Sequence, residues 1–127
     1  MSTIACNVSI EVNGGAPLSQ QTTLTAEAVT PLAVTVPENA TAFNITPVAI
    51  DVSQLKVLHI QANAAMTIKT NSSGSPDDTL TIAANKPLLW FEGCGMTCPL
   101  DTDVTQLYVA SVAGGSLQIT IGQDVTP

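Results

Sequence analysis

Apolar and polar residues alternate along most of this chain with a period of two, the spacing expected when one face of a strand is buried. The alternation is clearest over residues 4–12, where every second residue is apolar. Asn13, Gly14 and Gly15 follow, and these residue types favour a tight turn because they tolerate positive φ. We therefore predict a half-buried strand that ends in a hairpin turn. Its apolar positions are Ile4, Cys6, Val8, Ile10 and Val12.

Further segments with strand character follow at intervals of about ten residues, separated by residues that favour turns. Segment 55–62 is apolar on both faces, which indicates a central strand covered on both sides or packed on a partner. Pro31 and Pro37 flank segment 32–36 and predict a strand start or an edge strand, because proline lacks the N–H that a ladder needs. The remaining predicted strands cover residues 20–30, 40–50 (interrupted by Pro47), 66–70, 79–83, 86–91, 104–112 and 117–123, the last two as a closing hairpin.

The number and spacing of these segments predict an all-β fold of eight to ten short strands. We expect a β-sandwich, with a jelly roll as the first choice. An immunoglobulin-like sandwich is the second choice, because the Cys…Trp…Cys spacing of that fold is missing. The 127 residues suffice for one domain with a sizeable core, and no repeat or linker divides them. Residues 1–127 are therefore predicted to form one domain, with 1–13 as a candidate strand for exchange or docking.

The charge balance narrows the range of partners. Ten acidic residues stand against three lysines (Lys56, Lys69 and Lys86) and no arginine, which gives a net charge of −7. Because nucleic acids and anionic membranes are bound through basic side chains, we expect neither as a partner. No apolar run approaches the roughly 18–20 residues that a membrane span needs. An acidic surface suits a partner that is locally basic.

Residues that could support catalysis are few. His59 is the only histidine, and it lies between two apolar residues of a predicted strand, where a structural or surface role is typical. Asp77, Asp78, Asp101 and Asp103 could hold Ca²⁺ or act on a sugar, yet acids in such turns commonly accept hydrogen bonds from nearby backbone. No nucleophile elbow or phosphate-binding glycine loop is present. We therefore expect no enzyme activity and no cofactor.

The three cysteines are Cys6 and the close pair Cys94 and Cys98. We expect reduced thiols, since the chain begins with neither the basic nor the apolar region of a secretory signal. A disulfide between Cys94 and Cys98 stays open as an alternative, because the intervening loop contains glycine. Zinc would need four ligands, and the spacing of three thiols and one histidine does not suggest that they converge, so no metal site is predicted.

Several segments carry a resemblance to a known family. They are 67–80 (TIKTNSSGSPDDTL), 84–90 (ANKPLLW), 99–109 (PLDTDVTQLYV), 48–51 (VAID) and 119–124 (ITIGQD). Together they resemble small structural proteins of tailed phages, and the size and all-β character look most like the jelly-roll capsid decoration, or cement, proteins. The resemblance covers the chain from about residue 45 to its end, and the N-terminal third is similar only in style. No catalytic residue is carried over, because that family has none.

The resemblance implies a virion protein, made in the host bacterial cytoplasm, that binds the outer surface of an icosahedral head and bridges neighbouring capsomers. Its partners would be the major capsid protein and further copies of itself, as a dimer or trimer at a capsid symmetry axis. Two other functions stay open. One is a receptor- or carbohydrate-binding module of a phage tail or surface protein, with Trp90 in a concave site. The other is a small secreted hydrolase or inhibitor, which would need the Cys94–Cys98 disulfide.

Two segments are candidates for the interface. The first is the N-terminal strand, either as an arm exchanged with neighbours or as ordinary core. The second is Trp90, Phe91 and the loop 92–99. Adjacent residues of a regular strand face opposite ways, so either one aromatic is exposed or a bulge turns both inward. The candidate interface residues are Ile4, Val8, Ile10, Val12, Trp90, Phe91 and Met96.

Overall fold

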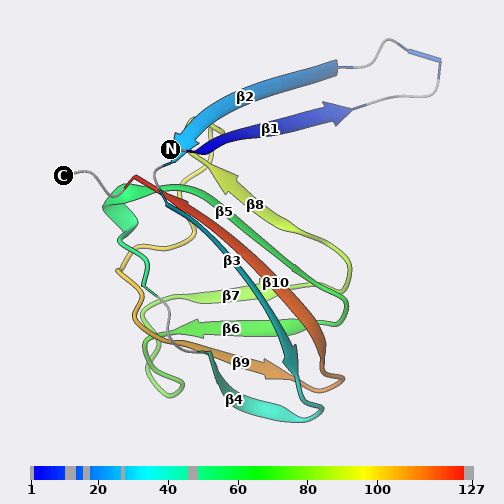
Figure 1. Ribbon diagram of the computed structural model, residues 1–127. Coiled ribbons are helices and arrows are strands. Elements are labelled where there is room, and N and C mark those ends of the chain that lie inside the picture. The colour runs from blue at the N-terminus through cyan, green and yellow to red at the C-terminus, as the bar shows by residue number, and fades with distance from the viewer. Residues whose placement is uncertain (1, 11–13, 16–17, 27, 46–48, 125–127) are drawn as a thin grey trace.

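The protein is a β-sandwich with a separate two-stranded arm (Figure 1). The computed structural model describes residues 2–10, 14–15, 18–26, 28–45 and 49–124. One four-stranded antiparallel sheet, called here the β5 sheet, has the order β3(Ala28–Val36), β10(Gly115–Gln123), β5(Leu55–Ala62), β8(Leu88–Phe91). The other, called the β6 sheet, has the order β4(Ala40–Ile45), β9(Leu107–Ser111), β6(Met66–Thr70), β7(Thr79–Ile82). The predicted all-β sandwich is confirmed, with ten strands among the described residues.

The core lies between the two large sheets, and it is formed by the alternate residues of each strand that point inward. On β5 and β10 every second residue, including Leu58, Ile60 and Leu117, is almost fully buried. Ile68 and Val109 face them from the β6 sheet and are equally buried. Burying such a side chain contributes about 1.5–3 kcal/mol, so these rows supply most of the stability of the sandwich.

The predicted closing hairpin is wrong, because β9 and β10 lie in different sheets. β10 pairs with β3 and β5, whereas β9 pairs with β4 and β6. The turn that carries the chain across uses Gly114 at a φ of 67°, and a Cβ there would lie 2.7 Å from the backbone nitrogen of Glu38. Gly114 and Gly115 therefore fit a tight crossing between sheets as well as they fit a hairpin turn.

The strand boundaries also correct the prediction around the prolines. Pro31 lies inside β3, opposite Thr120, and not at a strand start. β3 is an edge strand, so the predicted alternative of an edge strand is confirmed, and the missing N–H is tolerated there. The predicted strand 40–50 ends at Ile45, and residues 46–48, Pro47 among them, lie outside the described residues. Ile50 forms an isolated bridge with Val104, and a short 3₁₀ helix, η1(Val52–Gln54), leads into β5.

The predicted first hairpin is confirmed as β1(Ser2–Ile10) paired with β2(Leu18–Ala26). These two strands form their own sheet and extend away from the sandwich, so we call them the arm (Figure 1). Gly14 in the connecting segment has a φ of 84°, as a tight turn requires. Val12 lies outside the described residues.

Candidate functional site

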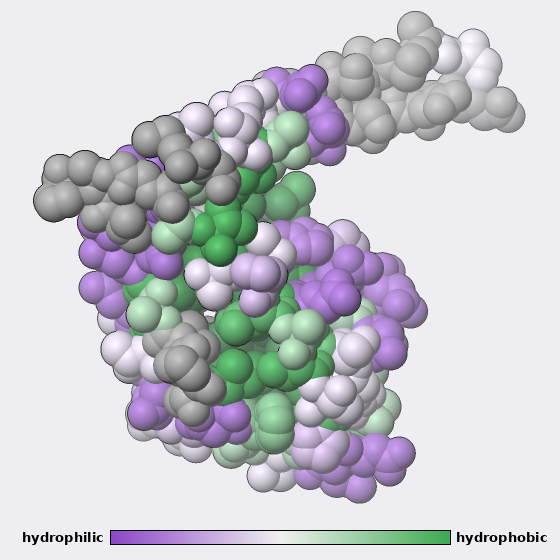
Figure 2. Space-filling view, viewed as in Figure 1, coloured by the Kyte–Doolittle hydropathy of each residue, from purple (hydrophilic) through white to green (hydrophobic). Residues whose placement is uncertain are grey.

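The base of the arm packs on the outer face of the β5 sheet. Cys6 of β1 is buried against Val57 of β5 and Phe91 of β8, and Ile4 and Leu24 pack around them. We call this cluster the arm seat. In Figure 2 apolar surface gathers below the base of the arm, which is where the two parts meet. The arm is therefore anchored by side chains at one end.

A glycine makes room for this contact. Gly122 of β10 is paired with Val57, and a Cβ at Gly122 would lie 2.8 Å from Cδ1 of Ile4. Ala26, at the end of β2, is 1% exposed and lies next to the same position. The absence of a side chain at Gly122 thus lets Ile4 lie directly on the sheet.

Trp90 and Phe91 are placed without a bulge. Trp90 pairs with Leu58 and packs against the core between the large sheets. Phe91 pairs with Val57 on the opposite face and is buried in the arm seat. Neither of the two alternatives considered for these aromatics describes the structure, because the arm covers the outer face and buries the second ring.

The loop after β8 is tied to the strands on both sides of it. The Glu92 N–H donates to Lys56 O at 2.9 Å, and the Cys94 N–H donates to Phe91 O at 3.0 Å. The Trp90 indole N–H donates to Met96 O at 3.0 Å, and Met96 is 75% exposed. The loop therefore presents an apolar side chain to solvent close to the arm seat.

An ion pair on the surface adds a further link between the loop after β8 and strand β5. Lys56 Nζ lies 2.7 Å from Glu92 Oε2, and the hydrogen bond to that carboxylate raises the pKa of the lysine. The glutamate is more than half exposed, so the pair contributes at most about 1 kcal/mol to stability.

All three thiols are free. Burial raises the pKa of Cys6, and the neighbouring Cys94 raises it further. Burial also raises the pKa of Cys98, which packs against the main core instead of the arm seat. Among the described residues, no group of three or more His, Cys, Asp and Glu side chains is arranged to hold a metal ion.

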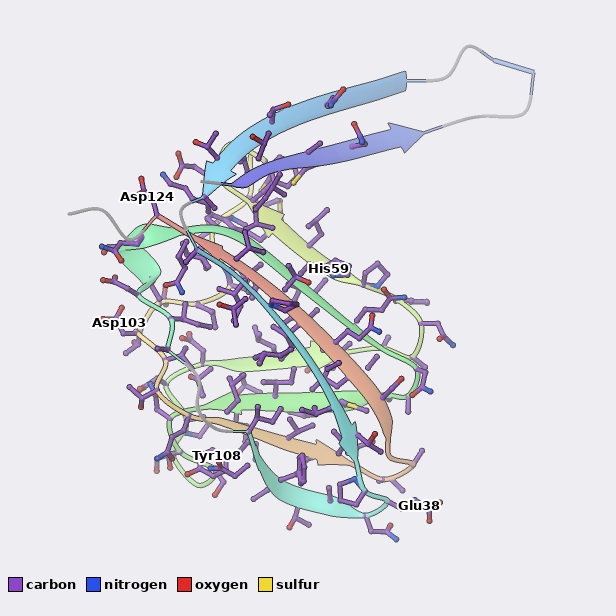
Figure 3. All side chains as sticks on the ribbon, in the orientation of Figure 1. Glu38, His59, Asp103, Tyr108 and Asp124 are labelled. Carbon is purple, nitrogen blue, oxygen red and sulfur yellow. The ribbon has the colours of Figure 1, made fainter. Side chains whose placement is uncertain are left out.

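His59 lies on the outer face of β5, between Thr120 of β10 and Leu89 of β8 (Figure 3). Its two cross-strand neighbours are a hydroxyl-bearing and an apolar residue. The half-buried imidazole is thus part of the sheet surface next to the arm seat.

Three of the four acidic residues considered as a calcium or sugar site, Asp77, Asp78 and Asp103, accept hydrogen bonds from nearby loops. Asp78 Oδ2 accepts from the Asp101 N–H at 3.0 Å, and Asp103 Oδ1 accepts from the Val52 N–H at 3.0 Å. Asp77 Oδ2 accepts from Asn71 Nδ2 at 2.7 Å. These carboxylates fasten loops at one end of the sandwich, where Figure 3 places Asp103.

The candidate interface residues divide into three groups. Ile4, Trp90 and Phe91 are engaged in packing within this chain, whereas Met96 is exposed. Val8 and Ile10 lie farther along β1, with their side chains outside the described part of the structure.

The sequence analysis did not identify two residues of the arm seat, Val57 and Leu24, or Gly122, on which Ile4 lies. For Val57 the signal was present, because segment 55–62 is apolar on both faces. At Val57 the strand is covered on both sides, and the covering element on the outer face is the arm. Farther along the same face His59 is half-buried and Gln61 is exposed.

Within the described residues, no helix is long and apolar enough to cross a bilayer. No protein-family model, curated protein or solved structure matches the chain.

Proposed function

We propose that this protein is a structural virion protein that binds the outer surface of a phage head and stabilises it by bridging capsomers. The observation that carries the proposal is the arm, which is anchored on the β5 sheet at its base and extends away from the sandwich. Bridging requires two separate contact surfaces on one molecule. A sandwich that rests on one capsomer and an arm that reaches a neighbour would supply them.

The strand order supports the finer assignment of the sandwich as a jelly roll. Every connection from β3 to β10, apart from that between β6 and β7, passes from one large sheet to the other. Alternation of this kind, in two four-stranded sheets, is what two interlocked Greek keys produce. The resemblance of segments 67–80 and 99–109 to phage decoration proteins points to the same architecture.

The charge of the molecule supports a protein partner with a basic surface. The net charge is −7, and Lys56, one of three lysines, is already paired with Glu92. Like-charged copies repel one another, so assembly on a shell would be guided by a basic patch on the major capsid protein. Copies that meet at a symmetry axis would form a dimer or trimer there.

The test is binding to expanded heads that lack their decoration protein. We expect the purified protein to sediment with such heads, to saturate at a fixed ratio to the major capsid protein, and to raise the temperature at which the heads break open. A protein that stays in the supernatant at saturating concentration would overturn the proposal. A glycan-binding screen would then examine the alternative of a receptor- or carbohydrate-binding module.

Two matched variants ask whether the arm makes the contact. Ala5→Lys adds a positive charge to the exposed face of the arm, and Gln118→Lys adds the same charge to the exposed outer face of β10. Both positions are exposed, so neither change should disturb folding. We expect Ala5→Lys to weaken binding about tenfold or more, because an added positive charge opposes the basic surface proposed on the capsid protein, and Gln118→Lys to bind as the unaltered protein does. Equal binding by the two variants would exclude the arm as the contact.

A further inference from the structure

Cys6 and Cys94 belong to different parts of the molecule and meet at the arm seat. Cys6 lies on β1 of the arm and is 6% exposed, and Cys94 follows β8 and packs against the same cluster. The contacts of the arm seat are made by apolar side chains and the two thiols. A bond between these two residues would therefore fix the arm to the sandwich.

Cys98, although closer to Cys94 in sequence, faces a different environment. It packs against the core between the large sheets, whereas Cys94 packs against the arm seat. The Cys94 N–H is held by Phe91 O at 3.0 Å, which keeps residue 94 next to the buried ring of the seat. The two cysteines of the loop are thus directed to separate clusters.

The loop also has the freedom that formation of a disulfide needs. Gly93 and Gly95 flank Cys94, each with a φ of 88°, and both have open space at the position of a Cβ. Because glycine populates a wider range of φ and ψ than other residues, the backbone on either side of Cys94 can adopt more conformations. Cys94 is half-exposed, so a small oxidant can reach it, whereas Cys6 is covered.

We propose that Cys6 and Cys94 form an oxidisable dithiol site that takes a low-molecular-weight disulfide such as oxidised glutathione, and that its oxidation locks the arm to the sandwich. The Cys94 thiolate attacks one sulfur of the glutathione disulfide, forms a mixed disulfide and releases one glutathione thiolate. The Cys6 thiolate then attacks the Cys94 sulfur and expels the second glutathione. Two protein thiols are oxidised, one glutathione disulfide is reduced to two thiols, and the protons end on glutathione and solvent.

Trypsin separates the thiols in a way that makes the product easy to identify. It cleaves after Lys56 and Lys69 but not after Lys86, which precedes a proline, so fragment 1–56 holds Cys6 and fragment 70–127 holds Cys94 and Cys98. The reduced protein is incubated with oxidised glutathione at about pH 8, near the ordinary thiol pKa, then acid-quenched, alkylated and digested without reduction. We expect a disulfide to join the two fragments. Before digestion, the oxidised protein should have the mass of one chain, which shows that the disulfide lies within a single molecule.

Two variants assign the partner of Cys6. With Cys98→Ser the joined fragments should form as in the unaltered protein, and with Cys94→Ser their formation should slow about tenfold or more, because the attacked sulfur is missing. Circular dichroism of the reduced variants checks that each is folded. Oxidation should also slow hydrogen exchange of the amides of β2 by about tenfold or more, and dithiothreitol should reverse the effect.

Three results would overturn the inference. They are a disulfide within fragment 70–127 as the main product, a covalent dimer joined through Cys6, and a glutathione adduct of Cys94 that never proceeds further. The inference does not rest on the proposed function, because every step uses the purified protein alone.

Discussion

At the scale of single residues, Asn71 shows how one amide can hold several loops. Its Nδ2 donates to Asp77 Oδ2 and to Asp103 O, each at 2.7 Å, and its Oδ1 accepts from the Thr105 N–H at 2.8 Å. Its backbone has a φ of 65°, a conformation that asparagine tolerates better than most residues. Asn71 therefore combines a turn with one link to its own loop and two links to the loop before β9, more than 30 residues along the chain.

Substitution at Asn71 can separate these two roles. Asn71→Gly keeps the backbone conformation but removes the three hydrogen bonds, and we expect it to lower the free energy of unfolding by about 2–3 kcal/mol. Asn71→Ala removes the same bonds and adds the strain of positive φ, so it should cost about 1 kcal/mol more. Urea denaturation of both variants measures the difference. Equal stability of the glycine variant and the unaltered protein would show that the bonds contribute nothing net.

The buried thiol of Cys6 makes stability depend on alkaline pH. Burial and the neighbouring Cys94 raise its pKa in the folded protein, so the unfolded chain releases this proton at a lower pH than the folded chain does. The unfolded state then binds fewer protons, and the contribution of Cys6, complete below the unfolded thiol pKa of about 8.5, is lost as pH rises through the folded pKa.

The check is a set of urea denaturations between about pH 7 and pH 10, with a phosphine reductant present to keep the thiols free. We expect the midpoint of the unaltered protein to fall more steeply above about pH 8.5 than that of Cys6→Ala. Every other ionisable side chain is present in both proteins, so the difference between the two curves reports on Cys6. Parallel curves would contradict the assignment.

At the scale of elements, the arm is a two-stranded ribbon, and such a ribbon is at best marginally stable unless it packs on something. Among the described residues its packing is concentrated in the arm seat, where Phe91 is the largest side chain. The stability of the arm should therefore depend on a few side chains, independently of the main core.

Phe91→Ala tests this independence. We expect it to reduce the free energy of opening the arm by about 2–4 kcal/mol, because a large buried ring is lost. Hydrogen exchange should speed up at the amides of β1 and β2, and those of β10 should keep their protection. Leu89→Ala, on the same strand but 43% exposed, is the control and should change little. If β10 lost protection to the same extent as the arm, the arm would not be a separate cooperative unit.

The elements that alternation signals well are those whose environment is local. The hairpin of β1 and β2 and strands such as β6 follow from period-two patterns and turn residues. The pairing of β10 with β3 and β5 does not, because glycines at a turn fit a hairpin and a sheet crossing equally. The arm seat joins Cys6, Val57 and Phe91, which lie far apart in sequence, so the apolar outer face of β5 could be predicted but not the element that covers it.

At the scale of the whole molecule, the charge makes a prediction for the proposed binding to phage heads. An acidic protein that approaches a basic patch is attracted over a distance of about 10 Å in 0.1 M salt. Raising the salt from about 50 to about 300 mM should slow association about tenfold or more and change dissociation much less. Stopped-flow or biosensor kinetics on immobilised heads measures both rates, and an association rate independent of salt would contradict electrostatic steering.

Because the Trp90 indole is hydrogen-bonded to Met96 O, the intrinsic fluorescence of Trp90 reports on the loop that contains Met96. Trp90 is the only tryptophan, so all intrinsic emission excited at long ultraviolet wavelengths comes from the ring that holds the exposed loop. Burying Met96 under a partner, or moving the loop when Cys94 reacts, would alter the polarity around that ring and shift its emission. Docking and thiol chemistry can thus be followed in real time on the unlabelled chain.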